Sequence, residues 1–248
     1  MIVFTVGIIT FLAVEGLLVY VLWKYRAGRG HEPEQIHGNT KMEIGWTAGA
    51  TIILVVLAVV GFLRLGVIRN PPNSVAGIGQ SVPQPVVFKD PSTNERLPPN
   101  HRAMVITVTG QQYFWSFSYP DRDNDPLNNV YAYGELVVPT GTTVILKITS
   151  NDVIHSWWIP KLGGKFDAVP GYNNYTWFQV PPNQAGSVYR GQCAELCGRN
   201  HANMLAQVRA LSPANYVKWL AEKKLELAQS KAAVTKQRAL VNAGLPLS

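Results

Sequence analysis

Charged side chains are scarce in this chain. Only 15% of its 248 residues are charged and 47% are apolar, whereas about 25% of residues are charged in a typical soluble domain. The deficit indicates that part of the chain lies in a membrane. Acidic residues are fewer than basic ones, and the net charge is +7. Residues 70–212 nevertheless hold ten basic and nine acidic residues, and this balance argues against a nucleic-acid-binding face.

Cysteine is also scarce, with only Cys193 and Cys197. Two thiols can form at most one disulfide. In an exported protein, a disulfide is the ordinary interpretation of such a cysteine pair. Their C-x3-C spacing differs from the C-x-x-C-H of covalent haem attachment, so this segment is not expected to bind haem. The chain has no internal repeat.

Two long apolar segments begin the chain, and we expect helices at about 1–23 and 44–68. Each has about the 20 residues that a membrane-spanning helix requires. Basic residues gather in the connection 24–43, which the positive-inside rule places in the cytoplasm. Residues 1–69 are therefore predicted to form a two-pass helical hairpin, with both chain ends and everything after residue 69 on the outer side. Glu15 lies within the first span, where a structural contact is favoured over a role in proton handling.

The remainder of the chain divides into three parts. Residues 70–102 are rich in Pro, Asn, Ser and Gly and are predicted to be a linker. Residues 103–211 hold short apolar runs with a period near two, which is typical of an all-β sandwich or barrel. The expected strands are 103–109, 111–119, 130–139, 142–150 and 175–180. In the tail, 212–248, Ser212 and Pro213 favour a helix start, and we expect a polar helix over 213–235.

The segment Cys193–Met204 carries the clearest chemical signal. It places two thiols, the imidazole of His201 and the thioether of Met204 within twelve residues. Soft sulfur ligands favour copper or zinc, and imidazole suits both metals. A second thiolate four positions from the first can bridge a second metal, and His155 supplies one more imidazole from an earlier strand end. A site for two copper ions is therefore predicted.

Two alternatives to this copper site are less consistent with the residues. A structural zinc site is conceivable, but its usual ligand spacings differ and Met204 would have no role. A disulfide between Cys193 and Cys197 would leave both histidines without a role.

With these residues in view, the sequence resembles subunit II of cytochrome c oxidase, over roughly residues 1–211. The resemblance implies a two-helix transmembrane hairpin and an all-β cupredoxin-like Greek-key barrel that holds the dinuclear CuA centre. It implies that both thiolates bridge the copper ions, with His155 and His201 as terminal ligands and Met204 as a weak ligand. The Glu195 carbonyl would be the weak ligand of the other copper, and the Glu195 side chain would reach a magnesium ion shared with subunit I.

Two further motifs match the same family. The segment Lys165–Gly171 resembles an acidic loop beside the metal, in which Asp167 would help to dock cytochrome c, although Asp167 could simply cap a turn. The segment Glu43–Thr47 resembles the family's E-x-x-W-T. There the glutamate lies at the cytoplasmic entrance of a proton path, although Glu43 could simply be an interfacial carboxylate near a helix N-terminus.

The aromatic strand departs from the family pattern. The family commonly reads G-H-Q-W-Y-W, and its first Trp accepts electrons, whereas here Tyr113 stands at that position, two residues before Trp115. Tyr113 and Trp115 are the candidates for the point at which electrons arrive. The donor is expected to be a cytochrome c, or a tethered or membrane-bound cytochrome. Candidate acidic docking residues are Asp121, Asp123 and Asp125, together with Asp167.

The resemblance implies an electron-accepting subunit of a proton-pumping oxidase in a bacterial plasma membrane. Its partners would be subunit I, which holds haem and CuB and reduces oxygen, and subunit III. A quinol-oxidase subunit II would lack the cysteine and histidine ligands. Nitrous oxide reductase would need a large propeller domain and no helical hairpin.

Overall fold

The computed structural model describes residues 2–26, 35, 37–75, 96–120, 125 and 128–242. These residues form two compact units, Met1–Val59 and Val60–Ser248. The first unit holds helix α1 (Ile2–Lys24) and most of helix α2 (Thr40–Arg69). Both helices are long and apolar enough to cross a membrane, and their apolar side chains are exposed on all sides, as a lipid-facing helix requires.

Helix α2 begins four residues before the predicted start because its N-terminus is capped. The Asn39 side chain accepts a hydrogen bond from the backbone N–H of Met42 (3.2 Å). The Glu43 carboxylate in turn accepts one from the backbone N–H of Asn39 (3.2 Å). These reciprocal bonds satisfy N–H groups that a helix start leaves without partners.

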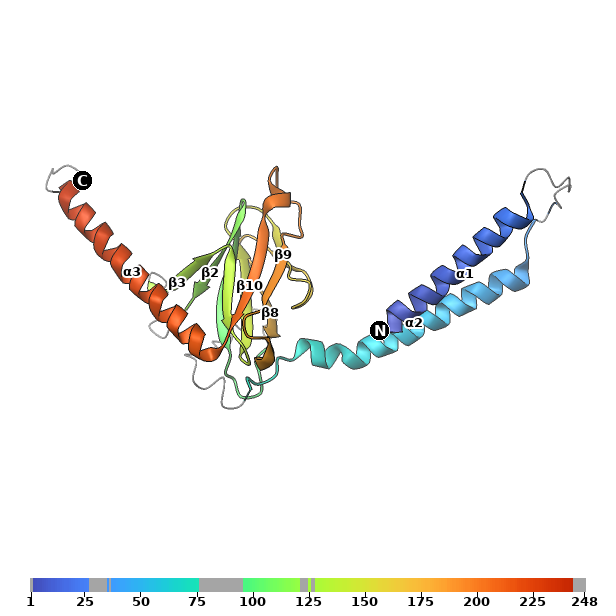
Figure 1. Ribbon diagram of the computed structural model, residues 1–248, viewed down its shortest axis with the longest axis horizontal. Coiled ribbons are helices and arrows are strands. Elements are labelled where there is room, and N and C mark those ends of the chain that lie inside the picture. The colour runs from blue at the N-terminus through green and yellow to red at the C-terminus, as the bar shows by residue number, and fades with distance from the viewer. Residues whose placement is uncertain are drawn as a thin grey trace. The chain divides into compact units, whose positions relative to one another are not determined.

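The second unit is built around a β-sandwich (Figure 1). Its larger sheet has the strand order β3-β2-β1-β5-β8, and its smaller sheet has the order β4-β10-β9. Strands β6 and β7 form a separate pair. Parallel pairs, β1 with β5 and β4 with β10, occur beside antiparallel ones. The strands of the larger sheet are β1 (Met104–Gln111), β2 (Phe114–Tyr119), β3 (Val130–Tyr133), β5 (Thr143–Ser150) and β8 (Asn174–Gln179). The others are β4 (Glu135–Pro139), β6 (His155–Trp157), β7 (Phe166–Ala168), β9 (Val188–Gln192) and β10 (Leu205–Leu211).

Alternating apolar residues create the core between the sheets. Strand β1 alternates buried and half-buried positions, and its inward side chains Met104, Ile106 and Val108 are 0–3% exposed. The two sheets are also joined by Tyr119 on β2, whose hydroxyl donates to the carbonyl of Val137 on β4 and accepts from its N–H (3.1 and 2.8 Å). Burial raises the pKa of Tyr119 well above its usual value, so the phenol stays neutral.

The segment 130–139 is two strands rather than the single predicted one. Gly134 interrupts it with a φ of +71°, a backbone conformation that favours glycine. Strand β3 before it pairs with β2 in the larger sheet, and strand β4 after it pairs with β10 in the smaller sheet. The glycine therefore marks the place where the chain passes from one sheet to the other.

The chain ends in helix α3 (Pro213–Asn242), seven residues longer than predicted. Ser212 caps its start by accepting from the Asn215 N–H (3.4 Å). Its buried residues, Tyr216 and Trp219, lie in the first turns, and further along the helix Lys231 donates a hydrogen bond to the Asn128 side chain. The observed fold confirms the expected class: two apolar helices, an all-β cupredoxin-like domain and a C-terminal helix.

Candidate metal centre

The loop between β9 and β10 holds most of the predicted ligands at one end of the sandwich. Its base is closed by a hydrogen bond from the Cys193 N–H to the Met204 carbonyl (2.9 Å). The next residue, Ala194, donates its N–H to the carbonyl of Ser156 on β6 (2.9 Å). Because His155 directly precedes Ser156, this contact holds the loop beside the histidine that comes from a distant part of the sequence.

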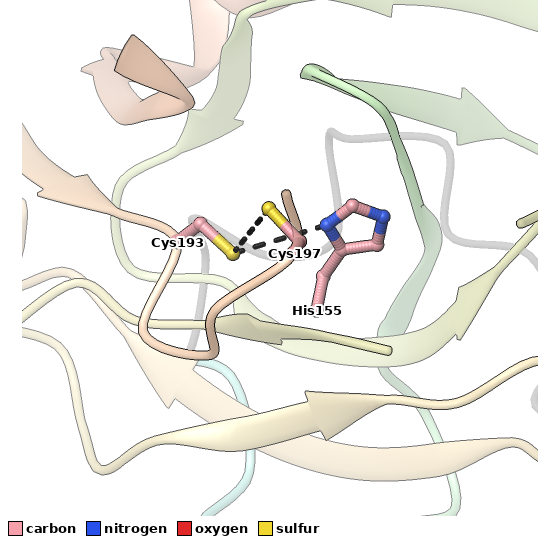
Figure 2. A group of neighbouring side chains, drawn as sticks. All are labelled: His155, Cys193 and Cys197. Atoms are coloured by element: carbon pink, nitrogen blue, oxygen red, sulfur yellow. Dashed lines mark hydrogen bonds between the residues drawn. The ribbon is translucent and has the colours of Figure 1, made fainter. Parts of the chain in front are cut away.

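Two thiols and one imidazole form the buried centre of this site (Figure 2). The Sγ atoms of Cys193 and Cys197 lie 3.8 Å apart, and both cysteines are free. Cys193 Sγ lies 3.9 Å from His155 Nδ1. These three ligand atoms all lie within 4.8 Å of one another, and His155 is fully buried.

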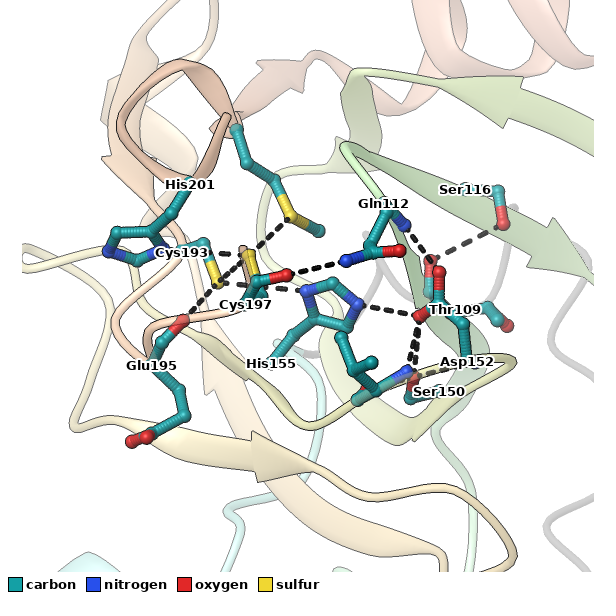
Figure 3. Close-up of polar contacts among 12 residues, drawn as sticks. Thr109, Gln112, Ser116, Ser150, Asp152, His155, Cys193, Glu195, Cys197 and His201 are labelled. Atoms are coloured by element: carbon teal, nitrogen blue, oxygen red, sulfur yellow. Dashed lines mark hydrogen bonds and ion pairs between the residues drawn. The ribbon is translucent and has the colours of Figure 1, made fainter. Parts of the chain in front are cut away.

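The other predicted donors surround the same two sulfurs (Figure 3). Cys197 Sγ lies 3.5 Å from His201 Nδ1 and 3.8 Å from the Met204 sulfur. Cys193 Sγ lies 3.3 Å from the Glu195 carbonyl oxygen. The structure thus places all six predicted donor groups together, and each sulfur is flanked by its own imidazole.

The donor set fits two soft metal ions better than one zinc ion. A metal about 2.3 Å from each thiolate can sit on either side of the sulfur pair, because 3.8 Å is less than twice that length. Six donors also exceed the four positions of a tetrahedral zinc site. Soft sulfur with imidazole is the ligand combination that suits copper.

Burial favours the protonated form of the Cys197 thiol when no metal is present. Loss of solvation, followed in effect by the neighbouring Cys193 side chain, raises the pKa of Cys197 to about 11. Metal binds the thiolate form, so loading of the site must release protons.

Asp152 and Gln112 tie His155 to the cysteine loop, and sequence reasoning did not identify them. One carboxylate oxygen of Asp152 lies 2.9 Å from His155 Nε2, and the other accepts from the backbone N–H of Gln112 (2.7 Å). The Gln112 side chain donates to the Cys197 carbonyl (2.7 Å). Fixing the second imidazole nitrogen in this way leaves Nδ1 directed at the sulfurs. The only local signal was the position of Asp152 three residues before the histidine.

Gly110 gives the His155 ring its space. A Cβ atom at this position would lie 2.8 Å from His155 Cδ2, closer than real Cβ atoms come, and 3.1 Å from the Trp115 ring, which is also tight. Trp115 contacts the histidine edge-on, with ring centroids 5.9 Å apart. The Trp115 ring therefore contacts the imidazole on one side, and the absence of a side chain at Gly110 leaves the space that the imidazole occupies.

The two aromatic candidates occupy different environments. Trp115 is fully buried and lies edge-on to His155, so its ring does not reach the protein surface. Tyr113 is half-buried in the turn between β1 and β2 rather than in the predicted strand. A Cβ atom at Gly198 would lie 2.7 Å from its hydroxyl, so Tyr113 packs against the cysteine loop.

The remaining predicted side chains, those of Asp167, Glu195 and Glu43, do not contact the sulfur pair. The exposed side chain of Asp167 belongs to β7, opposite Ser156 in register. Glu195 is exposed, and its carboxylate points away from the sulfurs (Figure 3). Glu43 lies in the other compact unit, at the start of α2.

Asp125, the described member of the predicted acidic docking run, does not lie beside the metal centre. Strand β2 leads away from the metal centre, from Phe114 to Tyr119, and β3 returns from Val130. Asp125 therefore belongs to the connection at the opposite end of these strands. Asp121 and Asp123 lie outside the described residues.

Two family descriptions match the chain. Residues 1–63 match the transmembrane domain of cytochrome c oxidase subunit II, and residues 127–211 match its periplasmic domain. A cytochrome c oxidase subunit 2 from Alkalihalophilus pseudofirmus is 34% identical over 211 residues, which cover 84% of this chain and 53% of that protein. This chain therefore spans about half the length of that relative.

Other relatives are covered more completely. A probable cytochrome c oxidase subunit 2 from Rickettsia bellii is 33% identical over 86% of this chain and 73% of its own length. Among solved structures, the periplasmic domain of subunit II of cytochrome oxidase from Bradyrhizobium japonicum has 30% identity and a TM-score of 0.45. That match covers 50% of this chain and 95% of the solved one.

Proposed function

This chain belongs to the subunit II family of cytochrome c oxidase, and on that premise we propose that it accepts electrons from a cytochrome through a dinuclear copper centre. The observation that carries the proposal is the cluster of two buried thiols with a separate imidazole beside each. A bound copper pair supplies one-electron transfer, from the donor toward haem in subunit I, where oxygen is reduced and protons are pumped.

The residues of this chain hold the centre rigid. Cys193 and Cys197 would bridge the ions, His155 and His201 would be terminal ligands, and Met204 and the Glu195 carbonyl would be weak ligands. Hydrogen bonds through Asp152 and Gln112 hold His155 and the cysteine loop in place, so little rearrangement would accompany a change of oxidation state of bound copper. A small rearrangement is what fast electron transfer requires.

One surface of the cysteine loop suits a partner subunit. Leu196, between the two cysteines, is 78% exposed. Beside it the exposed Glu195 carboxylate is free to reach a magnesium ion. We propose that this surface meets subunit I and that Glu195 shares the magnesium ion with it. Subunit III belongs to the same proposed complex.

We also propose the sidedness that the sequence predicts. The loop 24–43 would be cytoplasmic and the β-sandwich would lie on the outer side of a bacterial plasma membrane. Glu43 would guard a proton path, Asp167 would assist donor docking, and Tyr113 would stand where electrons arrive.

The test is copper stoichiometry and spectroscopy on the full chain. We expect two copper ions per chain and a mixed-valence signal in which the unpaired electron is shared equally. Cys197→Ser should abolish the sharing because it removes one bridge, whereas Leu196→Ala in the same loop should keep it. One copper per chain, or full zinc occupancy, would contradict the proposal.

A further inference from the structure

A pocket of about 290 Å³ lies where helix α2 ends against the edge strand β8. Arg69 and Arg96 line it together with Ile68 and the aromatic rings of Tyr175 and Trp177. All of these residues belong to the second compact unit. The Trp177 indole N–H donates to the Ile68 carbonyl (3.0 Å), which satisfies one of the carbonyls left open at the helix end.

The pocket is positively charged. Among the residues that the structure describes, none of those that line it is acidic. Arg96 donates to the Asn70 side chain (2.8 Å), and this bond leaves most of its five N–H donors available. Lys147 on β5 lies opposite Tyr175 on β8 and on the same face of the sheet. It is the one charged residue in strands β1, β5 and β8. Two guanidinium groups without a carboxylate between them are suited to a phosphate, which arginine binds through paired N–H groups.

The position of the pocket along α2 indicates which phosphate it meets. The apolar part of α2 from Ile44 to Leu63 has roughly 20 residues, and at 1.5 Å per residue it spans about 30 Å, the thickness of the hydrocarbon core. Ile68 and Arg69 therefore lie just beyond the hydrocarbon, at the level of the headgroups. Trp and Tyr side chains favour the same level, and here they form a wall of the pocket.

We propose that this pocket binds the phosphate of an anionic phospholipid, with Arg69 and Arg96 as donors and the rings of Tyr175 and Trp177 beside the headgroup. The site is separate from the metal centre and does not depend on copper. The bound lipid would anchor the end of α2 and the edge of the β-sandwich to the outer face of the plasma membrane.

Native mass spectrometry of the full chain, released from nanodiscs that contain phosphatidylglycerol and phosphatidylcholine, tests the proposal. The wild type should retain one phosphatidylglycerol that the Arg69→Gln/Arg96→Gln double variant loses. Each single variant should weaken retention about tenfold, because each removes charge-assisted hydrogen bonds. Arg102→Gln, an exposed arginine outside the pocket, should leave retention unchanged. Copper absorption of each variant reports that its β-sandwich is folded.

Three results would overturn the proposal. The first is equal retention of phosphatidylglycerol by the wild type and the double variant. The second is displacement of the lipid by millimolar inorganic phosphate, which would identify a free-anion site. The third is a wild-type oxidase complex that retains no lipid sensitive to these arginines, since a neighbouring subunit would then cover the pocket.

Discussion

At the scale of single residues, the metal centre relies on side chains that hold its ligands. Asp152 accepts hydrogen bonds on both carboxylate oxygens, and an amide at this position could accept on only one. We therefore expect Asp152→Asn to load copper with an affinity 10- to 100-fold weaker, roughly the effect of losing an outer partner of a ligating histidine. Asp125→Asn, at the far end of the strands, is the matched control. Copper titration against a competing chelator measures both, and equal affinities would show that Asp152 does not position the ligand.

The same carboxylate predicts a pH dependence of stability. Burial opposes ionisation of Asp152, but hydrogen bonds from the Gln112 N–H, His155 and the Val153 N–H outweigh it and lower its pKa below 3.8. A carboxyl whose pKa is lowered by folding stabilises the protein above its ordinary pKa, and this contribution is lost as the pH falls through the lowered value. The metal-free wild type should therefore be more stable than Asp152→Asn at pH 7, and the difference should shrink below about pH 4. Denaturant unfolding at the two pH values measures it, and a difference that stays constant would contradict the assignment.

At the scale of elements, the first turns of helix α3 hold its buried contacts with the β-sandwich. Tyr216 and Trp219 are buried, and the Trp219 ring meets Tyr119 on β2 edge-on at 5.2 Å. Trp219→Ala should lower the free energy of unfolding by about 3 kcal/mol, since it opens a cavity at a large aromatic. Leu225→Ala, two turns later at a position 60% exposed, should change it by less than about 0.5 kcal/mol. Similar losses for the two variants would mean that the whole helix is packed in solution.

The hydrogen bond that Glu43 makes at the N-terminus of α2 allows its two interpretations, proton-path residue and interfacial capping residue, to be tested separately. The carboxylate caps the helix start by accepting from the Asn39 N–H, and the carbonyl of a glutamine can accept the same bond. Glu43→Gln therefore removes the charge and the titrating group but keeps the cap. If Glu43 guards a proton path, steady-state turnover should fall while copper reduction by the donor is unchanged. Unchanged turnover would leave Glu43 with the capping role alone.

At the scale of the whole molecule, the charges near the metal centre predict how a donor approaches. Asp167 on β7 is the described acidic candidate near the metal centre, and Lys161 and Lys165 lie in the segment that leads into β7. Such a mixed field steers a basic cytochrome weakly. We expect electron transfer from the natural donor to depend only weakly on ionic strength, as for a donor held nearby by a tether or the membrane. Stopped-flow reduction across a salt series measures this, and a rate that collapses toward physiological salt would indicate a freely diffusing, steered cytochrome.

The membrane topology is a second property of the whole chain. A cysteine introduced at Gln35, in the connection between α1 and α2, should resist an impermeant thiol reagent applied to intact cells. A cysteine at Arg102, close to the start of β1, should react once the outer side is accessible. The reverse pattern would invert the proposed orientation.

The sequence by itself determined the features that depend on near neighbours. Apolar length defined α1 and α2, Ser212–Pro213 defined the start of α3, and alternation located β1, β5 and β8. The spacing from Cys193 to Met204 predicted a set of donors that the structure brings together around two sulfurs. Each of these signals lies within one segment, so a pattern of a dozen residues is enough to express it.

Only the tertiary structure decided the features that join distant segments. Strands β6, β7 and β9 are only three to five residues long and lack a clear alternation, so their pairing depends on partners elsewhere in the chain. The roles of Gly110, Gln112 and Asp152 arise from contacts across strands, since Gln112 reaches Cys197 85 residues away. The place of Asp125, in the connection between β2 and β3, likewise depends on the pairing of those two strands. Packing and hydrogen bonds between remote groups fix these positions, and such contacts leave no periodic trace in the sequence.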